Sequence, residues 1–185
     1  MAQSDVNKII AGELAQFDWQ SVLEVGCATG AVLSVVKGNF PDKIVKGIDC
    51  EADWEDERYK GVLDYAKNNG LDVEFGDGRK LNFDDESFDV VFCQAVLVMN
   101  KKEDFKKVIY EMIRVAKKVV IMVERHSDNR SKDGEYYDNN YPTRLIANFR
   151  FLEDEGYNIT LKKIPTGVWA GDWANDGYII KINKK

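Results

Sequence analysis

The stretch that decides the fold is Val22-Leu23-Glu24-Val25-Gly26-Cys27-Ala28-Thr29-Gly30, which Gly47-Ile48-Asp49 follows further along the chain. The apolar run over residues 22–25 predicts a buried strand, the small residues after it predict a tight turn, and residues 31–37 have helical periodicity. A second strand over residues 44–48 places Asp49 at its carboxyl end. Two parallel strands joined by a helix bring the turn and Asp49 to one edge of a sheet, where open α/β sheets bind ligands.

The residue types at this edge suit an adenosine-containing cofactor. Gly26 and Gly30 allow the backbone to turn sharply and to approach a ligand closely. Asp49 offers two carboxylate oxygens, which suit the two hydroxyl groups of a ribose. A dinucleotide site needs the spacing Gly-x-Gly-x-x-Gly. Here Cys27, Ala28 and Thr29 separate the two glycines, so that pattern fails.

The stretch over residues 24–30 resembles motif I of the class I S-adenosylmethionine-dependent methyltransferases, whose pattern is acidic-x-Gly-x-Gly-x-Gly. Ala28 stands where the middle glycine usually stands, which requires a negative φ or a small strain. The resemblance extends over about residues 22–183. It implies a Rossmann-like sheet of seven strands, S-adenosylmethionine as the cofactor and S-adenosylhomocysteine as the product.

The same resemblance assigns the cofactor-contacting positions. It implies that Asp77, after a third strand over residues 72–75, accepts a hydrogen bond from the adenine amine. The end of a fourth strand, at Gln94, should pass under the methionine part of the cofactor. The full predicted set is Glu24, Gly26, Cys27, Ala28, Gly30, Asp49, Cys50, Asp77, Gly78 and Gln94. Base-directed and amide-directed relatives carry Asn/Asp-Pro-Pro-Tyr/Phe at this fourth strand, and this chain reads Cys93-Gln94-Ala95-Val96 instead.

Strands and helices alternate along the first two thirds of the chain. Strands are expected over residues 21–25, 44–48, 72–75, 88–93, 118–123, 159–164 and 178–182, and helices over 4–17, 31–37, 55–68, 102–117 and 142–155. This order predicts an α/β fold: a three-layer, doubly wound, mostly parallel sheet of seven strands with a C-terminal antiparallel strand pair. We expect one domain over residues 1–185, with an N-terminal helix (1–20), a cofactor-binding half (21–123) and a substrate-side half (124–185).

The amino-acid composition indicates which kinds of binding partner and which location are expected. The 185 residues include 26 Lys and Arg against 32 Asp and Glu, a net charge of −6, which disfavours tight binding to nucleic acid. No apolar run approaches the ~20 residues that span a bilayer, and no signal peptide is recognisable. The three cysteines lack metal-ligand spacing and are expected to pack beside the ligand, with metal or thiol chemistry as the alternative. A cytoplasmic location is therefore expected.

The catalytic candidates follow the fifth strand. His126 is the only histidine and titrates near neutrality, so it is a candidate general base, with an exposed loop residue as the alternative. Glu124 is a candidate substrate contact. The irregular segments 124–140 and 165–177 are expected to define the acceptor pocket, for a small molecule first and a protein side chain second. Two other hypotheses stay open: a non-catalytic, cofactor-binding partner or regulatory subunit, and a nicotinamide-dependent oxidoreductase.

Overall fold

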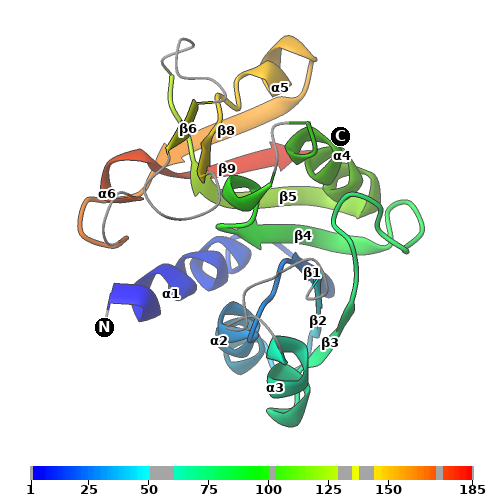
Figure 1. Cartoon of the computed structure of the whole chain (residues 1–185). Coiled ribbons are helices and arrows are strands. Elements are labelled where there is room, and N and C mark those ends of the chain that lie inside the picture. The colour runs from blue at the N-terminus through cyan, green and yellow to red at the C-terminus, as the bar shows by residue number, and fades with distance from the viewer. Residues whose placement is uncertain are drawn as a thin grey trace.

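A seven-stranded sheet forms the centre of the computed structural model, which describes residues 2–50, 61–100, 103–128, 135–137, 144–169 and 173–184 (Figure 1). The strand order is β3-β2-β1-β4-β5-β9-β8. The bounds of these strands are β1 Ser21–Val25, β2 Ile44–Asp49, β3 Asp72–Phe75, β4 Phe88–Gln94, β5 Ala116–Arg125, β8 Asn158–Lys163 and β9 Gly177–Asn183.

The sheet is mostly parallel. Strands β1 to β5 pair in parallel, whereas β9 lies antiparallel between β5 and β8. The predicted seven-stranded sheet with a C-terminal antiparallel pair is therefore confirmed. The chain winds outward in one direction from β1 and in the other from β4, so the order of the sheet reverses between these two strands. Open α/β sheets place their ligands at such a reversal, and we call the region at the carboxyl ends of β1 and β4 the crevice.

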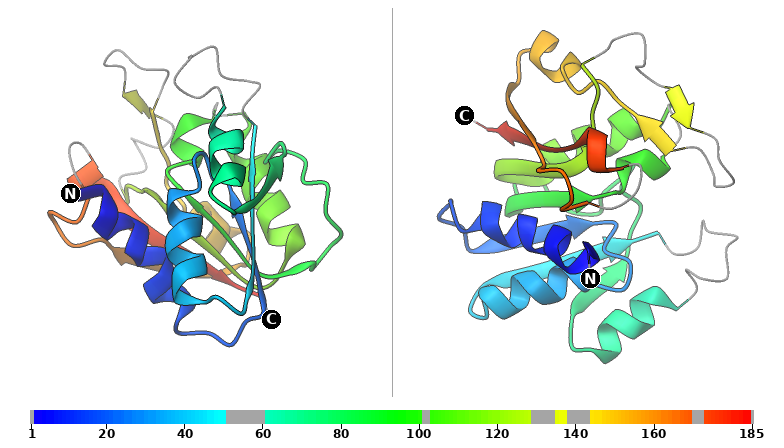
Figure 2. Two further views of the ribbon diagram at one scale, coloured as in Figure 1. Left: turned by 90° about the horizontal axis from the view of Figure 1, so that it is seen from below. Right: turned by 90° about the vertical axis from the view of Figure 1, so that its left-hand side faces the viewer.

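Helices cover both faces, as Figure 2 shows. Helices α1 (Ala2–Leu14), α2 (Ala31–Asn39) and α3 (Val62–Asn68) pack on one face, and α4 (Phe105–Val115) and α5 (Phe151–Asp154) pack on the other. Because side chains alternate along a strand, Val22 packs in the core under α1, α2 and α3, and Leu23 packs in the core under α4 and α5. Both faces of the central strands are thus buried, which explains the unbroken apolar run in β4.

The C-terminal third departs from the sequence prediction. The expected helix over residues 142–155 is wrong: β7 (Arg144–Ile146) pairs antiparallel with β6 (Glu135–Tyr137) in a separate two-stranded sheet, and only α5 is helical. Pairing with the neighbouring strand β6 gives residues 144–146 an extended backbone in place of the expected helix. Two short helices were not expected, η3 (Leu97–Met99) and α6 (Trp173–Asp176). Residues 55–60 of the predicted third helix lie outside the described residues.

In the part of the chain that is described, no helix has both the length and the apolar character needed to cross a bilayer.

Candidate functional site

The glycine turn joins β1 to α2 and is tied to β2. The amides of Gly26 and Cys27 both donate to the carbonyl oxygen of Ile48, at 2.8 and 2.9 Å. Three residues of the turn have left-handed backbone: Gly26 at φ +76°, Ala28 at +46° and Gly30 at +75°. Of the two alternatives expected for Ala28, the structure therefore shows the small strain rather than the negative φ.

Protein packing requires both glycines. A Cβ on Gly26 would lie 2.4 Å from Cγ2 of Val96, and one on Gly30 would lie 2.3 Å from Cδ1 of Leu71. Sequence reasoning expected the backbone of Gly26 to lie against a ligand. That contact stays a prediction, and the structure adds a limit from within the protein, because the side chain of Val96 lies against Gly26.

Asp49 organises the crevice through its main chain and its side chain. Its Oδ2 accepts a hydrogen bond of 2.8 Å from the amide of Ala28, and its carbonyl oxygen accepts one of 3.0 Å from Gly76. The side chain is half-buried at the carboxyl end of β2, at the edge where the sequence placed it. Holding the glycine turn is a role that the sequence did not reveal.

Glu24 is a buried carboxyl group directly before the turn, with an exposed fraction of 2%. Burial, together with the nearby charge of Asp49, raises the pKa of Glu24 well above its ordinary value. Among the described residues, its Oε2 has no hydrogen-bond partner. Burial therefore favours the neutral form of this carboxyl group, close to the turn.

Asp77 and Gly78 follow β3 at the same edge. The carboxylate of Asp77 accepts hydrogen bonds from the backbone amide of Arg79 at 2.8 Å and from its Nε at 2.9 Å. These bonds and the guanidinium charge lower the pKa of Asp77. A Cβ on Gly78 would lie 3.0 Å from Cγ1 of Val25, so Gly78 packs against the end of β1. The structure brings both residues to the crevice, with Asp77 bonded to its own turn.

Gln94 ends β4 and points toward α1. Its Nε2 donates to Oδ1 of Asn7 at 3.1 Å, whereas its Oε1 is buried and has no partner within the described part of the chain. No sequence signal pointed to Asn7, because the two residues are 87 positions apart along the chain.

The cysteines gather at the carboxyl ends of three strands, as expected. Cys27 and Cys93 are buried and Cys50 is partly exposed. Burial raises the pKa of the thiols of Cys27 and Cys93. Both thiols are therefore neutral and pack as small apolar groups.

Glu124 supports the turn after β4. It is fully buried, and its Oε1 accepts hydrogen bonds from the amides of Val96 at 2.7 Å and Leu97 at 2.9 Å. The thiol of Cys93 lies 3.5 Å from the same oxygen. Burial raises the pKa of Glu124 to about 7. The carboxyl group thus holds the start of η3 through Oε1, while Oε2 has no hydrogen-bond partner among the described residues. A contact between Glu124 and the substrate stays a prediction.

His126 is buried, with an exposed fraction of 1%, so the expectation of an exposed loop residue is wrong. Its Nδ1 accepts a hydrogen bond of 3.2 Å from the amide of Phe149, and its Nε2 lies 3.2 Å from Oδ1 of Asp128. The ring also packs edge-on against Tyr178. Burial lowers the pKa of His126. Both ring nitrogens are engaged within the protein, so this geometry does not support the general-base role.

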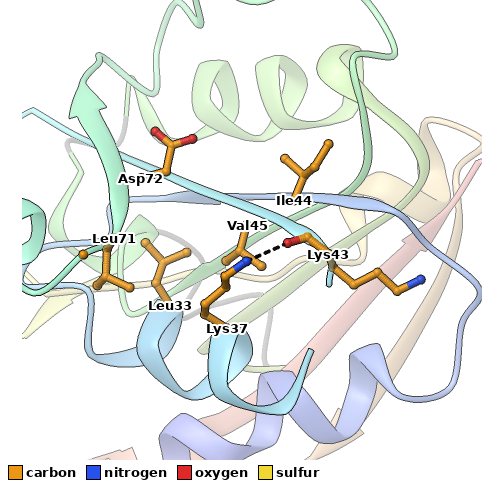
Figure 3. Close-up of a pocket in the computed structure, with 8 residues that line it drawn as sticks. Leu33, Lys37, Lys43, Ile44, Val45, Leu71 and Asp72 are labelled. Carbon is orange, nitrogen blue, oxygen red and sulfur yellow. Dashed lines mark hydrogen bonds between the residues drawn. The ribbon is translucent and has the colours of Figure 1, made fainter. Parts of the chain in front are cut away.

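A hollow of about 330 Å³ lies elsewhere on the molecule (Figure 3). It is formed by α2, the amino ends of β2 and β3, and the turn before β3, and its lining residues are Leu33, Lys37, Lys43, Ile44, Val45, Gly70, Leu71 and Asp72. Because the strands are parallel, their amino ends lie at the edge opposite the glycine turn. This hollow is therefore separate from the crevice.

Residues 22–119, more than half of the chain, match the model of a family described as a methyltransferase domain. The chain belongs to this methyltransferase domain family. The assignment confirms the resemblance seen in motif I and supports S-adenosylmethionine as the cofactor. An uncharacterised protein of Haemophilus influenzae is 26% identical to this methyltransferase domain over 159 residues, which are 86% of the chain. The match covers 58% of that longer protein.

Solved structures resemble this methyltransferase domain over almost its whole length. The PH0226 protein of Pyrococcus horikoshii has a TM-score of 0.69 at 17% identity, covering 98% of this chain and 88% of its own. Magnesium protoporphyrin IX methyltransferase of Synechocystis with bound S-adenosylhomocysteine has a TM-score of 0.69 at 15% identity. The match covers 100% of this chain and 84% of that protein. A [4+2]-cyclase has a TM-score of 0.72 at 16% identity, and the match covers 98% of this chain and 81% of the cyclase. At such identities the likeness shows the fold.

Proposed function

We propose that this chain binds S-adenosylmethionine in the crevice at the carboxyl ends of β1, β2 and β4 and transfers its methyl group to an acceptor. The observation that carries the proposal is the glycine turn over residues 26–30, which Asp49 fixes at the point where the strand order reverses. Open α/β sheets bind their ligands at this point. Family membership supports the reaction class.

The residues at the crevice fit the cofactor. The turn presents backbone in a conformation that leaves no space for side chains at Gly26 and Gly30, and Asp49 stands beside it with a carboxylate suited to the ribose. Gln94 contributes a buried amide oxygen that has no partner in the described structure and therefore suits a hydrogen-bond donor. We propose that Glu24, Cys27, Ala28, Cys50, Asp77 and Gly78 complete the surroundings of the cofactor.

The bound cofactor supplies a methyl group already activated on a sulfonium, so we assign the protein chiefly a positioning role. Holding two reactants in attack geometry contributes roughly 7–11 kcal/mol. The hydrogen bonds of Glu124 and His126, the two candidate catalytic residues at the end of β5, support this positioning role. Oε1 of Glu124 and both ring nitrogens of His126 are engaged within the protein, whereas Oε2 of Glu124 is buried and has no hydrogen-bond partner in the described structure.

We place the acceptor over the carboxyl ends of β4 and β5, between the segments 124–140 and 165–177. Among their described residues, Arg125 forms an ion pair of 2.8 Å with Asp176, and His126 donates its amide to the carbonyl of Asp176 at 2.9 Å. These contacts tie α6 to the end of β5. A small molecule is the first choice of acceptor and a protein side chain the second, because the net charge of −6 disfavours nucleic acid. The small number of cysteines, three in 185 residues, supports a cytoplasmic location.

A second candidate function is cofactor binding without methyl transfer. The likeness to a [4+2]-cyclase favours keeping this alternative, because it shows that the fold accommodates another activity. The nicotinamide alternative is less well supported, because the spacing of glycines in the turn differs from the dinucleotide pattern.

Calorimetry with S-adenosylhomocysteine and with NAD tests the cofactor, and a methyl-transfer screen with labelled S-adenosylmethionine tests the activity. We expect binding of S-adenosylhomocysteine alone and transfer to at least one small molecule. Binding of NAD without S-adenosylhomocysteine would overturn the proposal. Cofactor binding without transfer, together with a stable complex with another protein on pull-down, would favour the non-catalytic alternative.

A further inference from the structure

Helix α1 reaches the crevice through a single amide pair. Oδ1 of Asn7 accepts a hydrogen bond of 3.1 Å from Nε2 of Gln94, which joins residues that are 87 positions apart. On either side of Asn7, the apolar side chains of Val6 and Ile10 have exposed fractions of 2% and 0%. Helix α1 is therefore anchored by apolar packing, and Asn7 is held in place beside β4.

The strand register locates the amide of Gln94. Glu24 of β1 pairs with Phe92 of β4 in the last residue pair of these strands, so Gly26 and Gln94 each follow that pair by two residues, at the carboxyl ends of the two strands. Phe92 packs in the core that α1 and α2 cover. Because side chains alternate along a strand, Gln94 projects to that same face. Its amide therefore lies between α1 and the glycine turn.

The bond to Asn7 fixes which way the amide faces. With Nε2 directed at Asn7, Oε1 points away from α1, and this oxygen is buried without a partner in the described structure. An unsatisfied buried acceptor destabilises the free protein. A ligand with an N–H group at this place would remove that destabilisation, and the charged ammonium of an amino acid would form a strong hydrogen bond.

We propose that Asn7 is a positioning residue of the cofactor site. It orients Gln94 so that Oε1 accepts a hydrogen bond from the ammonium group on the amino-acid portion of the methyl donor. Asn7 itself does not touch the cofactor. This inference rests on the proposed function, and it makes α1 a part of the site.

Two substitutions of Asn7 distinguish its role in orienting Gln94 from a role in packing alone. Asn7→Leu keeps the size of the side chain and removes the acceptor, whereas Asn7→Asp keeps an oxygen that accepts from Nε2 of Gln94. The probes are S-adenosylhomocysteine and 5′-methylthioadenosine. The second probe has the same nucleoside and a thioether but lacks the ammonium and the carboxylate. Calorimetry gives both affinities, and thermal unfolding confirms that each variant is folded.

We expect Asn7→Leu to weaken S-adenosylhomocysteine five- to tenfold and to leave 5′-methylthioadenosine within twofold of the unsubstituted protein. Asn7→Asp should stay within twofold for both ligands. Gln94→Leu should reproduce the selective loss, and adding Asn7→Leu to it should cause no further loss. Equal weakening of both ligands by Asn7→Leu, or no weakening at all, would overturn the inference. Failure of the unsubstituted protein to bind either ligand would instead defeat the proposed function.

Discussion

The carboxylate of Asp49 holds the backbone of Ala28 through a hydrogen bond of 2.8 Å from the Ala28 amide to Oδ2. This bond explains how alanine occupies a left-handed position, at φ +46°, where the family pattern has glycine. The left-handed conformation costs alanine roughly 1–2 kcal/mol. A hydrogen bond to a charged group contributes about 1.5–3 kcal/mol. The bond is therefore strong enough to offset the strain.

Asp49→Ala should weaken S-adenosylhomocysteine by about 1–3 kcal/mol and lower the free energy of unfolding by a similar amount, because the turn and the ribose lose the same carboxylate. Asp49→Asn keeps an oxygen for the amide of Ala28 and loses the charge. We expect Asn at this position to weaken the ligand while leaving stability closer to that of the unsubstituted protein. Calorimetry and urea unfolding measure the two effects. Unchanged affinity in both variants would remove Asp49 from the ribose site.

Ala28→Gly should change the free energy of unfolding by less than about 1 kcal/mol, because relief of strain opposes the entropy that glycine gains in the unfolded chain. Ala28→Val should destabilise the protein, since a β-branched side chain resists this backbone conformation. In the Asp49→Ala background, Ala28→Gly should recover part of the lost stability. Urea unfolding of the unsubstituted protein, Ala28→Gly, Asp49→Ala and the double variant tests this coupling. If Ala28→Gly recovers no stability in the Asp49→Ala background, the coupling between the two residues is contradicted.

Gly26→Val should abolish binding of S-adenosylhomocysteine, because its Cβ would lie 2.4 Å from Cγ2 of Val96 at a φ of +76°. The clash moves the end of β4 as well as the turn. Adding Val96→Ala removes the methyl groups in the way but leaves the backbone strain. We therefore expect the double variant to recover stability in urea and only part of the affinity. Normal ligand binding by the single variant would show that the turn does not contact the cofactor.

Glu124→Gln should change how stability depends on pH. The pKa of Glu124 in the folded protein is about 7, above the ordinary 4.5. The folded state therefore binds more protons, and the contribution of Glu124 to stability is present at low pH and is lost as the pH rises toward 7. Relative to Glu124→Gln, the unsubstituted protein should lose about 2 kcal/mol between pH 5 and pH 8. Parallel pH profiles in urea unfolding would contradict the raised pKa.

The sequence predicted the parts of this molecule that depend on local pattern. Strands β1 and β3 begin and end at the predicted residues, and the glycine turn lies at the predicted edge of the sheet. Part of what it missed depends on contacts between distant segments. His126 is buried by Phe149 and Tyr178, which lie more than 20 residues away. The bond between Asn7 and Gln94 has the same origin, because the two residues are 87 positions apart. The pairing of β6 with β7 is local by contrast, and the prediction failed there because residues 142–155 were interpreted as one helix.

Strand β9 lies between β5 and β8, although it comes after both along the chain. During synthesis, residues 177–183 therefore emerge from the ribosome after the two strands that they separate. Within the described structure β8 pairs with β9 alone, so it has no place in the sheet until β9 arrives. Until then the outer edge of β5 presents unpaired backbone groups, which attract strands of other chains. The emerging chain is thus exposed to aggregation in the interval between the synthesis of β5 and that of β9.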